Sequence, residues 1–202
     1  VMGSNGIPGA WRKNPEQGGG MMLDWGVHLI DQMLLMIDDK VKSVECDYSY
    51  QAGEKADDGF DLLVKFKGGM RYRIVVETNT FIELPRWQVY GKDGTGTITN
   101  WRRDNVEGKM VRVTQRYDDK LEGVNAGNGF TKTMAARRAE TEQELPLEIV
   151  RGDKNAFYRN FMDAVISNKP TLVTQSQELR VYAVMEAAKK SSDENRVIEL
   201  DI

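Results

Sequence analysis

The spacing of apolar residues changes twice along the chain, from helical to strand-like near residue 40 and back to helical near residue 155. The first stretch predicts a helix over residues 20–37, because its apolar positions recur at intervals of three and four: Leu23, Val27, Ile30, Leu34 and Ile37. Alternating apolar and polar residues then predict strands over residues 44–50, 60–66, 72–78, 87–89, 96–99 and 110–116. Their connections are short, so most neighbouring strands should be antiparallel.

Two helices and a short strand are predicted to close the chain. The first helix ends at Lys169-Pro170 and has one apolar face, formed by Phe157, Phe161, Ala164 and Val165. The second helix begins where Thr174 and Gln177 have the spacing of a capping box. Together with the first helix and the strands, these elements predict an α+β fold: an open, mostly antiparallel sheet with helices packed on one face.

Both faces of the predicted sheet carry apolar side chains. Leu63 and Val75 each lie between two apolar neighbours, so they belong to the opposite face from those neighbours. One face packs on helices, and no further helix in the chain obviously covers the other. Because obligate homodimer interfaces resemble a split core, we expect this second face to be used for oligomerisation.

Two polar stretches show no clear period. Residues 118–150 include a helix-tolerant composition over 134–144, and we interpret them as a lid or surface arm of a single domain spanning residues 1–202. Residues 54–58 form an acidic loop, which we interpret as solvated.

Composition and charge narrow the classes of partner. The chain has 202 residues with a formal net charge of −3 and no basic run, which argues against nucleic acid as a partner. No apolar run approaches the roughly 20 residues of a membrane-spanning helix. Cys46 is the sole cysteine and fits a reducing compartment, so we expect a cytoplasmic protein. The first six residues lack the features of a signal peptide and start abruptly, as in a fragment of a longer protein.

The candidate chemistry lies on the first helix. Asp24, His28 and Asp31 occupy positions i, i+4 and i+7, on one side of the helix, and His28 is the only histidine. The alternative for this spacing is a helix-surface ion pair worth a few tenths of a kcal/mol. Three features favour a functional role: the absence of another histidine, the internal Gly26, which predicts a close approach by backbone or ligand, and the preceding Gly18-Gly19-Gly20. Unpaired N–H groups after these glycines are expected to favour an anionic or hydroxyl-rich ligand.

Other kinds of site find little support. One histidine with a remote cysteine is too few ligands for zinc, so we expect no metal. The sequence has no G-x-S-x-G elbow and no P-loop ending. Gly91, Gly94 and Gly96 lie between strands, so they are no dinucleotide fingerprint, and we expect no cofactor-binding residues in this chain. Trp11 and Arg12 are either a surface anchor or a rim that contacts substrate.

Several motifs together resemble a known family. The segment with Trp11-Arg12 followed by the Gly18–Asp31 motif resembles the start of the C-terminal domain of Gfo/Idh/MocA oxidoreductases, the glucose–fructose oxidoreductase and inositol dehydrogenase family. Residues 89–96 resemble a strand–turn–strand pair of that family, and residues 157–170 and 178–191 resemble its last two helices. Residues 118–150 match no part of it.

The resemblance implies a two-domain, NAD- or NADP-dependent oxidoreductase acting on a sugar, polyol or related hydroxy compound. Its cofactor would be bound mainly by an N-terminal Rossmann domain, which is absent here together with a Glu-Lys-Pro lysine, so this fragment alone should be inactive. In this chain His28 would exchange a proton with the substrate and Asp24 would orient its hydroxyls, with Trp11 and Arg12 as further substrate-binding residues. Dimers would form through the sheet.

Elementary chemistry agrees with these roles. Oxidation of a secondary alcohol needs a base that works near neutral pH, which imidazole supplies, and a neighbouring carboxylate favours the protonated imidazole. Two alternatives stay open: NAD-dependent glycoside hydrolysis within the same family, and a non-catalytic assembly module.

Overall fold

The computed structural model describes residues 9–102, 105–117 and 120–202, which form two compact units. The first unit comprises the described residues of Val1–Glu83 together with Asp153–Ile202, and the second comprises those of Leu84–Gly152. Each unit is described by itself. The predicted lid or arm at 118–150 belongs to the second unit, and two of its residues, 118 and 119, lie outside the described residues.

An antiparallel sheet of four strands, in the order β10-β1-β2-β3, forms the first unit. Its strands are β1 (Val41–Ser49), β2 (Gly59–Phe66), β3 (Arg71–Glu77) and β10 (Ile198–Glu199). β2 and β3 form a hairpin around the predicted turn at residues 67–69, and β10 pairs with the outer edge of β1. The predicted strands, their antiparallel pairing and the closing edge strand are thus confirmed.

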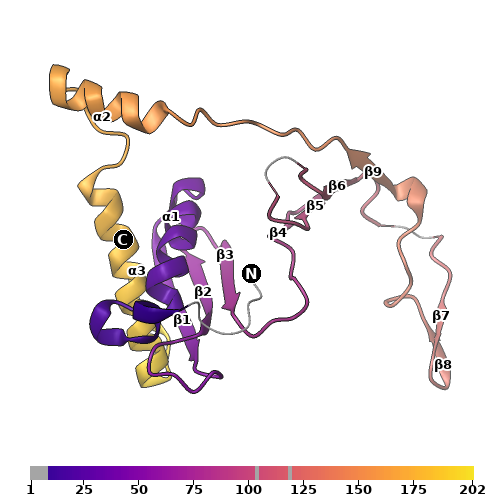
Figure 1. Cartoon of the computed structure of the whole chain (residues 1–202). Coiled ribbons are helices and arrows are strands. Elements are labelled where there is room, and N and C mark those ends of the chain that lie inside the picture. Colours follow the sequence, from indigo (N-terminus) through magenta and orange to yellow (C-terminus); the bar gives the residue numbers. More distant parts are fainter. Residues whose placement is uncertain (1–8, 103–104, 118–119) are drawn as a thin grey trace. The chain divides into compact units, whose positions relative to one another are not determined.

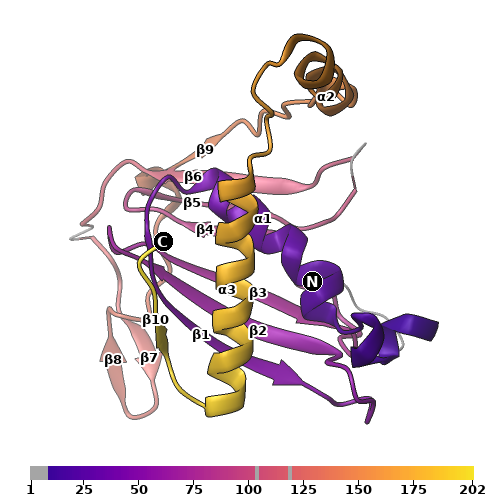
Figure 2. The same ribbon diagram turned by 90° about the vertical axis from the view of Figure 1, so that its left-hand side faces the viewer.

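Helices cover one face of this sheet (Figures 1 and 2). They are α1 (Val27–Met36) and α3 (Gln175–Glu194), and α3 lies across the strands beside α1. The core between helices and sheet is fully apolar at its centre, where Ile30, Met33, Phe60, Leu62, Val64, Val184 and Ala188 have no exposed surface. This arrangement confirms the α+β fold with helices on one face.

The opposite face of the sheet is mostly charged. Glu45, Leu63 and Arg73 lie side by side across β1, β2 and β3, and an Arg73–Asp61 ion pair joins two strands on the same face. Leu63 and Val75, which the sequence assigned to this face, are half-buried among these charges. Both apolar residues of this face are therefore paired across the strands with charged residues, and the use of the face for oligomerisation stays a prediction.

The first helix begins with a π-helical turn at Met22–Gly26 and continues as α1 to Met36. The N–H of Val27 donates to the carbonyl of Met22, five residues back. The predicted helix over 20–37 is confirmed, but its first turn is wider than the α period on which the spacing of Asp24 and His28 was interpreted.

The two C-terminal helices differ in how they pack. α3 starts with the predicted capping box of Thr174 and Gln177 and buries six residues against the sheet and α1. α2 (Ala156–Ser167) has no buried residue, and the apolar face predicted from Phe157, Phe161 and Val165 is exposed. The sequence thus located the helix and its stripe but not a surface that covers it.

The second unit contains a four-stranded antiparallel sheet in the order β4-β5-β6-β9 and a separate β7-β8 hairpin. The strands are β4 (Trp87–Tyr90), β5 (Gly94–Ile98), β6 (Gly108–Val113), β7 (Val124–Ala126), β8 (Gly129–Thr131) and β9 (Glu142–Leu145). The helix-tolerant stretch over 134–144 forms a short 3-10 turn at Ala139–Thr141 and then β9, because β9 pairs with β6. In neither unit does a described helix have the length and apolar character that crossing a bilayer requires.

Candidate functional site

The start of the first helix is fixed by Asp57, which lies in the loop before β2. The carboxylate Oδ2 of Asp57 accepts a hydrogen bond from the N–H of Met22 at 2.8 Å, and its backbone carbonyl accepts one from Met21 at 3.1 Å. All three residues are buried. Burial raises the pKa of Asp57, while the hydrogen bonds from these backbone N–H groups lower it in part. Asp57 therefore acts as the N-terminal cap of the site helix.

The glycines before the helix permit two close approaches. A Cβ on Gly19 would lie 2.5 Å from the carbonyl oxygen of Arg12, and one on Gly20 would lie 2.0 Å from Oδ1 of Asp57. Gly20 also has a φ of +110°, which disfavours any side chain. The glycines thus bring the segment with Trp11 and Arg12 against the helix start.

The expectation that N–H groups after the glycines are free for a ligand was wrong. The N–H groups of Gly18, Gly19 and Gly20 donate to the carbonyls of Pro15, Asn14 and Arg12. The next two N–H groups along the chain donate to the backbone carbonyl and the carboxylate of Asp57. The acidic loop at 54–58 was also interpreted wrongly as solvated, since Asp57 and Asp58 are buried. The anion at this helix start is the protein's own carboxylate.

Arg12 holds the carboxylate of Asp24. Its Nε donates to Oδ2 of Asp24 at 2.8 Å, and its guanidinium lies 4.4 Å from the ring centroid of Trp11. The hydrogen bond to Asp24 raises the pKa of Arg12, which stays protonated. Asp24 is 17% exposed, so its carboxylate is reachable but largely enclosed. The structure therefore brings three of the four predicted site residues together.

His28, the fourth predicted site residue, is exposed on α1. Within the described part of the chain, no hydrogen bond or ion pair joins it to Asp24, whose Oδ2 is bound by Arg12. Asp31, one turn further along α1, is exposed as well. The imidazole is therefore free to meet a ligand, and the carboxylate is positioned by Arg12 instead of by the imidazole.

The internal Gly26 has a packing reason. A Cβ there would lie 2.5 Å from Sδ of Met22 and 3.2 Å from Cζ of Phe60 on β2. Gly26 is thus at a close approach, but side chains make this approach and not the backbone or ligand that we expected. Gly26 thus seats the π-helical turn directly on the core.

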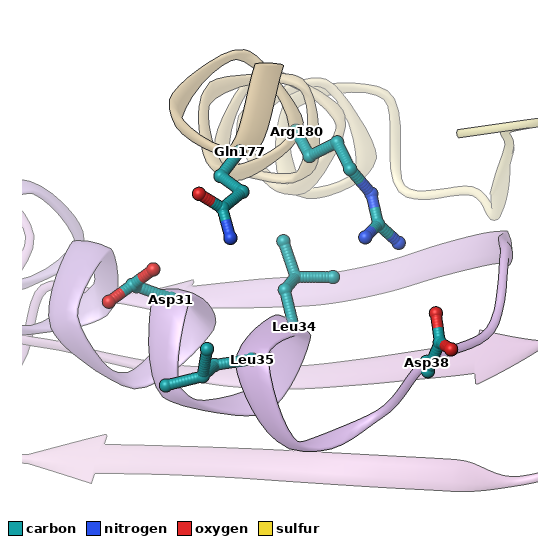
Figure 3. Close-up of a pocket in the computed structure, with 6 residues that line it drawn as sticks. All are labelled: Asp31, Leu34, Leu35, Asp38, Gln177 and Arg180. Carbon is teal, nitrogen blue, oxygen red and sulfur yellow. The ribbon is translucent and has the colours of Figure 1, made fainter. Parts of the chain in front are cut away.

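A pocket of about 230 Å³ lies between α1 and the start of α3 (Figure 3). Leu34 points up between Gln177 and Arg180, and Asp31 and Asp38 stand at the two ends. Leu35 completes the lining. Asp31 belongs both to the predicted edge and to this pocket, so the two features are continuous along α1.

The described residues give little support for a metal site, a reactive thiol or a dinucleotide-binding site. They contain no group of three or more His, Cys, Asp and Glu side chains that could hold a metal ion. Burial raises the pKa of Cys46 to about 12, which keeps its thiol protonated. Between the described strands every pairing is antiparallel, and no glycine-rich turn leads from a strand into a helix, so these residues do not fit a dinucleotide cradle.

Sequence reasoning missed three residues of this region. Asp57 was hidden in an acidic loop, and its position just before a buried strand was the available signal. Gln177 was recognised only as a cap, and Arg180 carried no local signal. Both meet α1 through tertiary packing, which periodicity does not encode.

Comparison with known proteins assigns the chain to a protein family. The sequence profile of the oxidoreductase family, C-terminal alpha/beta domain (Gfo/Idh/MocA), matches residues 4–200. A curated relative, scyllo-inositol 2-dehydrogenase (NADP(+)) IolW of Bacillus subtilis (strain 168), is 24% identical over 199 residues, covering 96% of this chain and 53% of the relative. The chain thus spans about half the length of that curated relative.

Solved structures give the same result. An NAD-binding protein from Listeria innocua matches with a TM-score of 0.89 and 38% identity, over 99% of this chain and 57% of that protein. The fold is also similar to that of an aldose-aldose oxidoreductase from Caulobacter crescentus, with a TM-score of 0.63 and 16% identity over 98% of this chain and 54% of that one. The resemblance deduced from the motifs is confirmed. The chain belongs to the Gfo/Idh/MocA oxidoreductase family and corresponds to the C-terminal alpha/beta domain of that family's proteins.

Proposed function

We propose that this domain binds the substrate of an NAD- or NADP-dependent oxidoreductase that acts on a sugar, polyol or related hydroxy compound. The observation that carries the proposal is the exposed imidazole of His28, four residues along the same helix from a carboxylate, Asp24, that Arg12 holds in place. Family membership supports the oxidoreductase class. The polyol class is supported by the printed name of the relative scyllo-inositol 2-dehydrogenase.

The two carboxylate oxygens of Asp24 have different roles in this proposal. Oδ2 of Asp24 is bound by Arg12, and no other hydrogen bond to this carboxylate is found within the described residues. Oδ1 is therefore the acceptor left for a substrate hydroxyl. A hydroxyl on the neighbouring carbon would then lie toward His28, so a vicinal diol matches the site.

His28 accepts the proton of the reacting hydroxyl as the alcohol becomes a carbonyl, and it returns that proton in the reverse direction. Trp11 presents an apolar ring face at the rim, and this ring holds the guanidinium of Arg12 by a cation–π contact. The nicotinamide cofactor, bound mainly outside this segment, supplies the hydride chemistry when it is present. This domain alone is accordingly expected to be inactive.

The test uses the full-length protein that contains this segment. His28→Ala should lower kcat at least 100-fold, since a positioned general base contributes about 10²–10⁴-fold, while the Kd for NAD or NADP changes little. Met36→Ala, at an exposed position near the end of α1, is the matched control. Arg12→Lys keeps the charge but loses the planar fork, so it should raise KM for the hydroxy compound.

Unchanged turnover in His28→Ala would remove the imidazole from the mechanism and leave the assembly-module alternative. No feature of the described residues favours glycoside hydrolysis over oxidation. The homo-oligomer through the outer sheet face, the N-terminal Rossmann partner and the cytoplasmic location belong to the same proposal. Analytical ultracentrifugation of the full-length protein tests the oligomer directly.

A further inference from the structure

The pocket between α1 and α3 continues the same helix face that carries His28. His28, Asp31 and Leu35 stand at i, i+3 and i+7 on α1, so they share one face. With a rise of about 1.5 Å per residue, Leu35 lies about 10 Å along the helix from His28. A ligand that meets His28 and extends along α1 would therefore enter this pocket.

Hydrogen-bond donors line the α3 side of the pocket, and acceptors line its α1 side. On the α3 side, Gln177 uses its Oε1 for the capping box with Thr174, which leaves its Nε2 directed toward α1 (Figure 3). Arg180 donates from Nη2 to the carbonyl of Asp39 at 3.0 Å, while its Nε is buried without a hydrogen-bond partner. On the α1 side, Asp31 and Asp38 offer exposed carboxylates.

This lining discriminates between classes of ligand. Two carboxylates disfavour an anion, and the guanidinium of Arg180 disfavours a cation close to it. A hydroxyl can donate to Asp31 or Asp38 and accept from Gln177 or Arg180. Leu34 and Leu35 give an apolar surface against which the C–H face of a ring can pack. A neutral ring with several hydroxyls satisfies all of these groups.

The size fits one ring. The pocket volume of about 230 Å³ lies below the roughly 300–1,000 Å³ of sites that enclose a whole drug-sized ligand. It accommodates part of a ligand whose other part lies at Asp24 and His28.

We propose that Gln177, Arg180, Asp31 and Leu35 form a second subsite, and that the substrate is a two-ring hydroxy compound such as a glycoside of a sugar or cyclic polyol. The ring that reacts lies at His28, and the second ring lies in the pocket between α1 and α3. This inference rests on the proposed function, and it specifies the substrate class of the same site.

Two substitutions test the subsite with little effect on the fold. Gln177→Glu keeps the acceptor that completes the capping box but replaces the Nε2 donor by an oxygen, which can also pair with Arg180. Leu35→Trp enlarges a residue that is 74% exposed at the pocket rim. Leu179→Trp is the matched control, since Leu179 is 60% exposed on α3 and does not line the pocket.

Binding to the full-length protein is measured by isothermal titration calorimetry with matched probes: glucose and maltose, galactose and lactose, and myo-inositol and galactinol. In at least one pair the two-ring compound should bind about tenfold more tightly than the single ring. Leu35→Trp and Gln177→Glu should each reduce that advantage to less than threefold and leave the Kd of the single ring unchanged, and Leu179→Trp should preserve it.

The subsite is overturned if no two-ring probe binds better than its single ring, or if the advantage survives both pocket variants. An equal loss in Leu179→Trp would overturn it too. His28→Ala separates this inference from the proposed function, because it should lower kcat at least 100-fold while the two-ring advantage in binding remains. Unchanged turnover in His28→Ala refutes the catalytic role, whereas a vanished two-ring advantage in the native protein refutes the subsite alone.

Discussion

Replacing Asp57 by alanine should weaken the start of the helix that carries Asp24 and His28. The substitution removes the carboxylate that accepts the N–H of Met22 at 2.8 Å, and Met22 is 2% exposed. Water therefore cannot readily take the place of the lost acceptor. The backbone carbonyl of residue 57, which accepts from Met21, remains.

The magnitude follows from the burial of this hydrogen bond. A buried donor left without a partner costs about 1–3 kcal/mol, and loss of an N-cap costs about 0.5–2 kcal/mol. Both figures describe the same bond, so they are not added, and the expected loss is about 2 kcal/mol. Asp57→Asn keeps an acceptor and should lose less than half as much.

The charge of Asp57 gives the effect a pH dependence. Burial raises its pKa in the folded protein, so the protonated form favours folding and the ionised form is penalised. The stability contributed by this group is fully present below the unfolded pKa of about 3.9 and is lost as the pH rises through the raised folded value. Asp57→Asn cannot ionise, so the stability that it lacks relative to the native protein should become smaller as the pH rises through that interval.

Amide hydrogen exchange at Met22, followed by NMR, measures the change at the bond itself. A loss of about 2 kcal/mol lowers the protection of this amide roughly 30-fold. Asp47→Ala, at an exposed position on β1, is the control and should leave the protection unchanged. If Asp57→Ala protects the Met22 amide as well as the native protein does, Asp57 is not the cap and the helix start is fixed by other contacts.

Two further predictions concern the packing below this helix. Gly26→Ala inserts a Cβ 2.5 Å from Sδ of Met22 and 3.2 Å from the Phe60 ring. This overpacking should lower the free energy of unfolding, measured in urea, by about 1–3 kcal/mol. The control is Gly96→Ala, whose Cβ meets nothing within 4 Å and which should not show that overpacking cost. Cys46, with a pKa raised to about 12 by burial, should resist iodoacetamide at pH 8 in the folded protein and react fully in guanidinium, as read by mass spectrometry; rapid labelling without denaturant would contradict its burial.

Much of the first unit could be predicted because its patterns are local. The strand alternation of β1, β2 and β3 reflects one buried and one exposed face, and the capping box of α3 is a short-range hydrogen-bond pattern. β9 could not be predicted in the same way. Its sequence tolerates a helix, and its pairing with β6, about 30 positions earlier, decides its conformation.

The site shows a similar division between local and tertiary information. Asp24 and His28 were found because they stand four positions apart on a periodic helix, but the partner of Asp24 proved to be Arg12, twelve positions away. The π-helical turn at Met22–Gly26 also changes the spacing on which an i, i+4 pair depends. Asp57 fixes that turn from a loop that the sequence alone could not place against the helix.

The Arg12–Asp24 pair contributes to the site mainly through orientation. The two side chains are 33% and 17% exposed, and ion pairs at such positions contribute about 0–1 kcal/mol to stability. Asp57, by contrast, is buried and fixes the same helix start from below. The fold therefore depends on the buried carboxylate of Asp57, whereas loss of the Arg12–Asp24 pair would cost the fold little stability. Because Trp11 and Gly19 hold Arg12 in place from the side of the loop, a ligand hydroxyl that binds Asp24 meets a carboxylate whose orientation is already fixed.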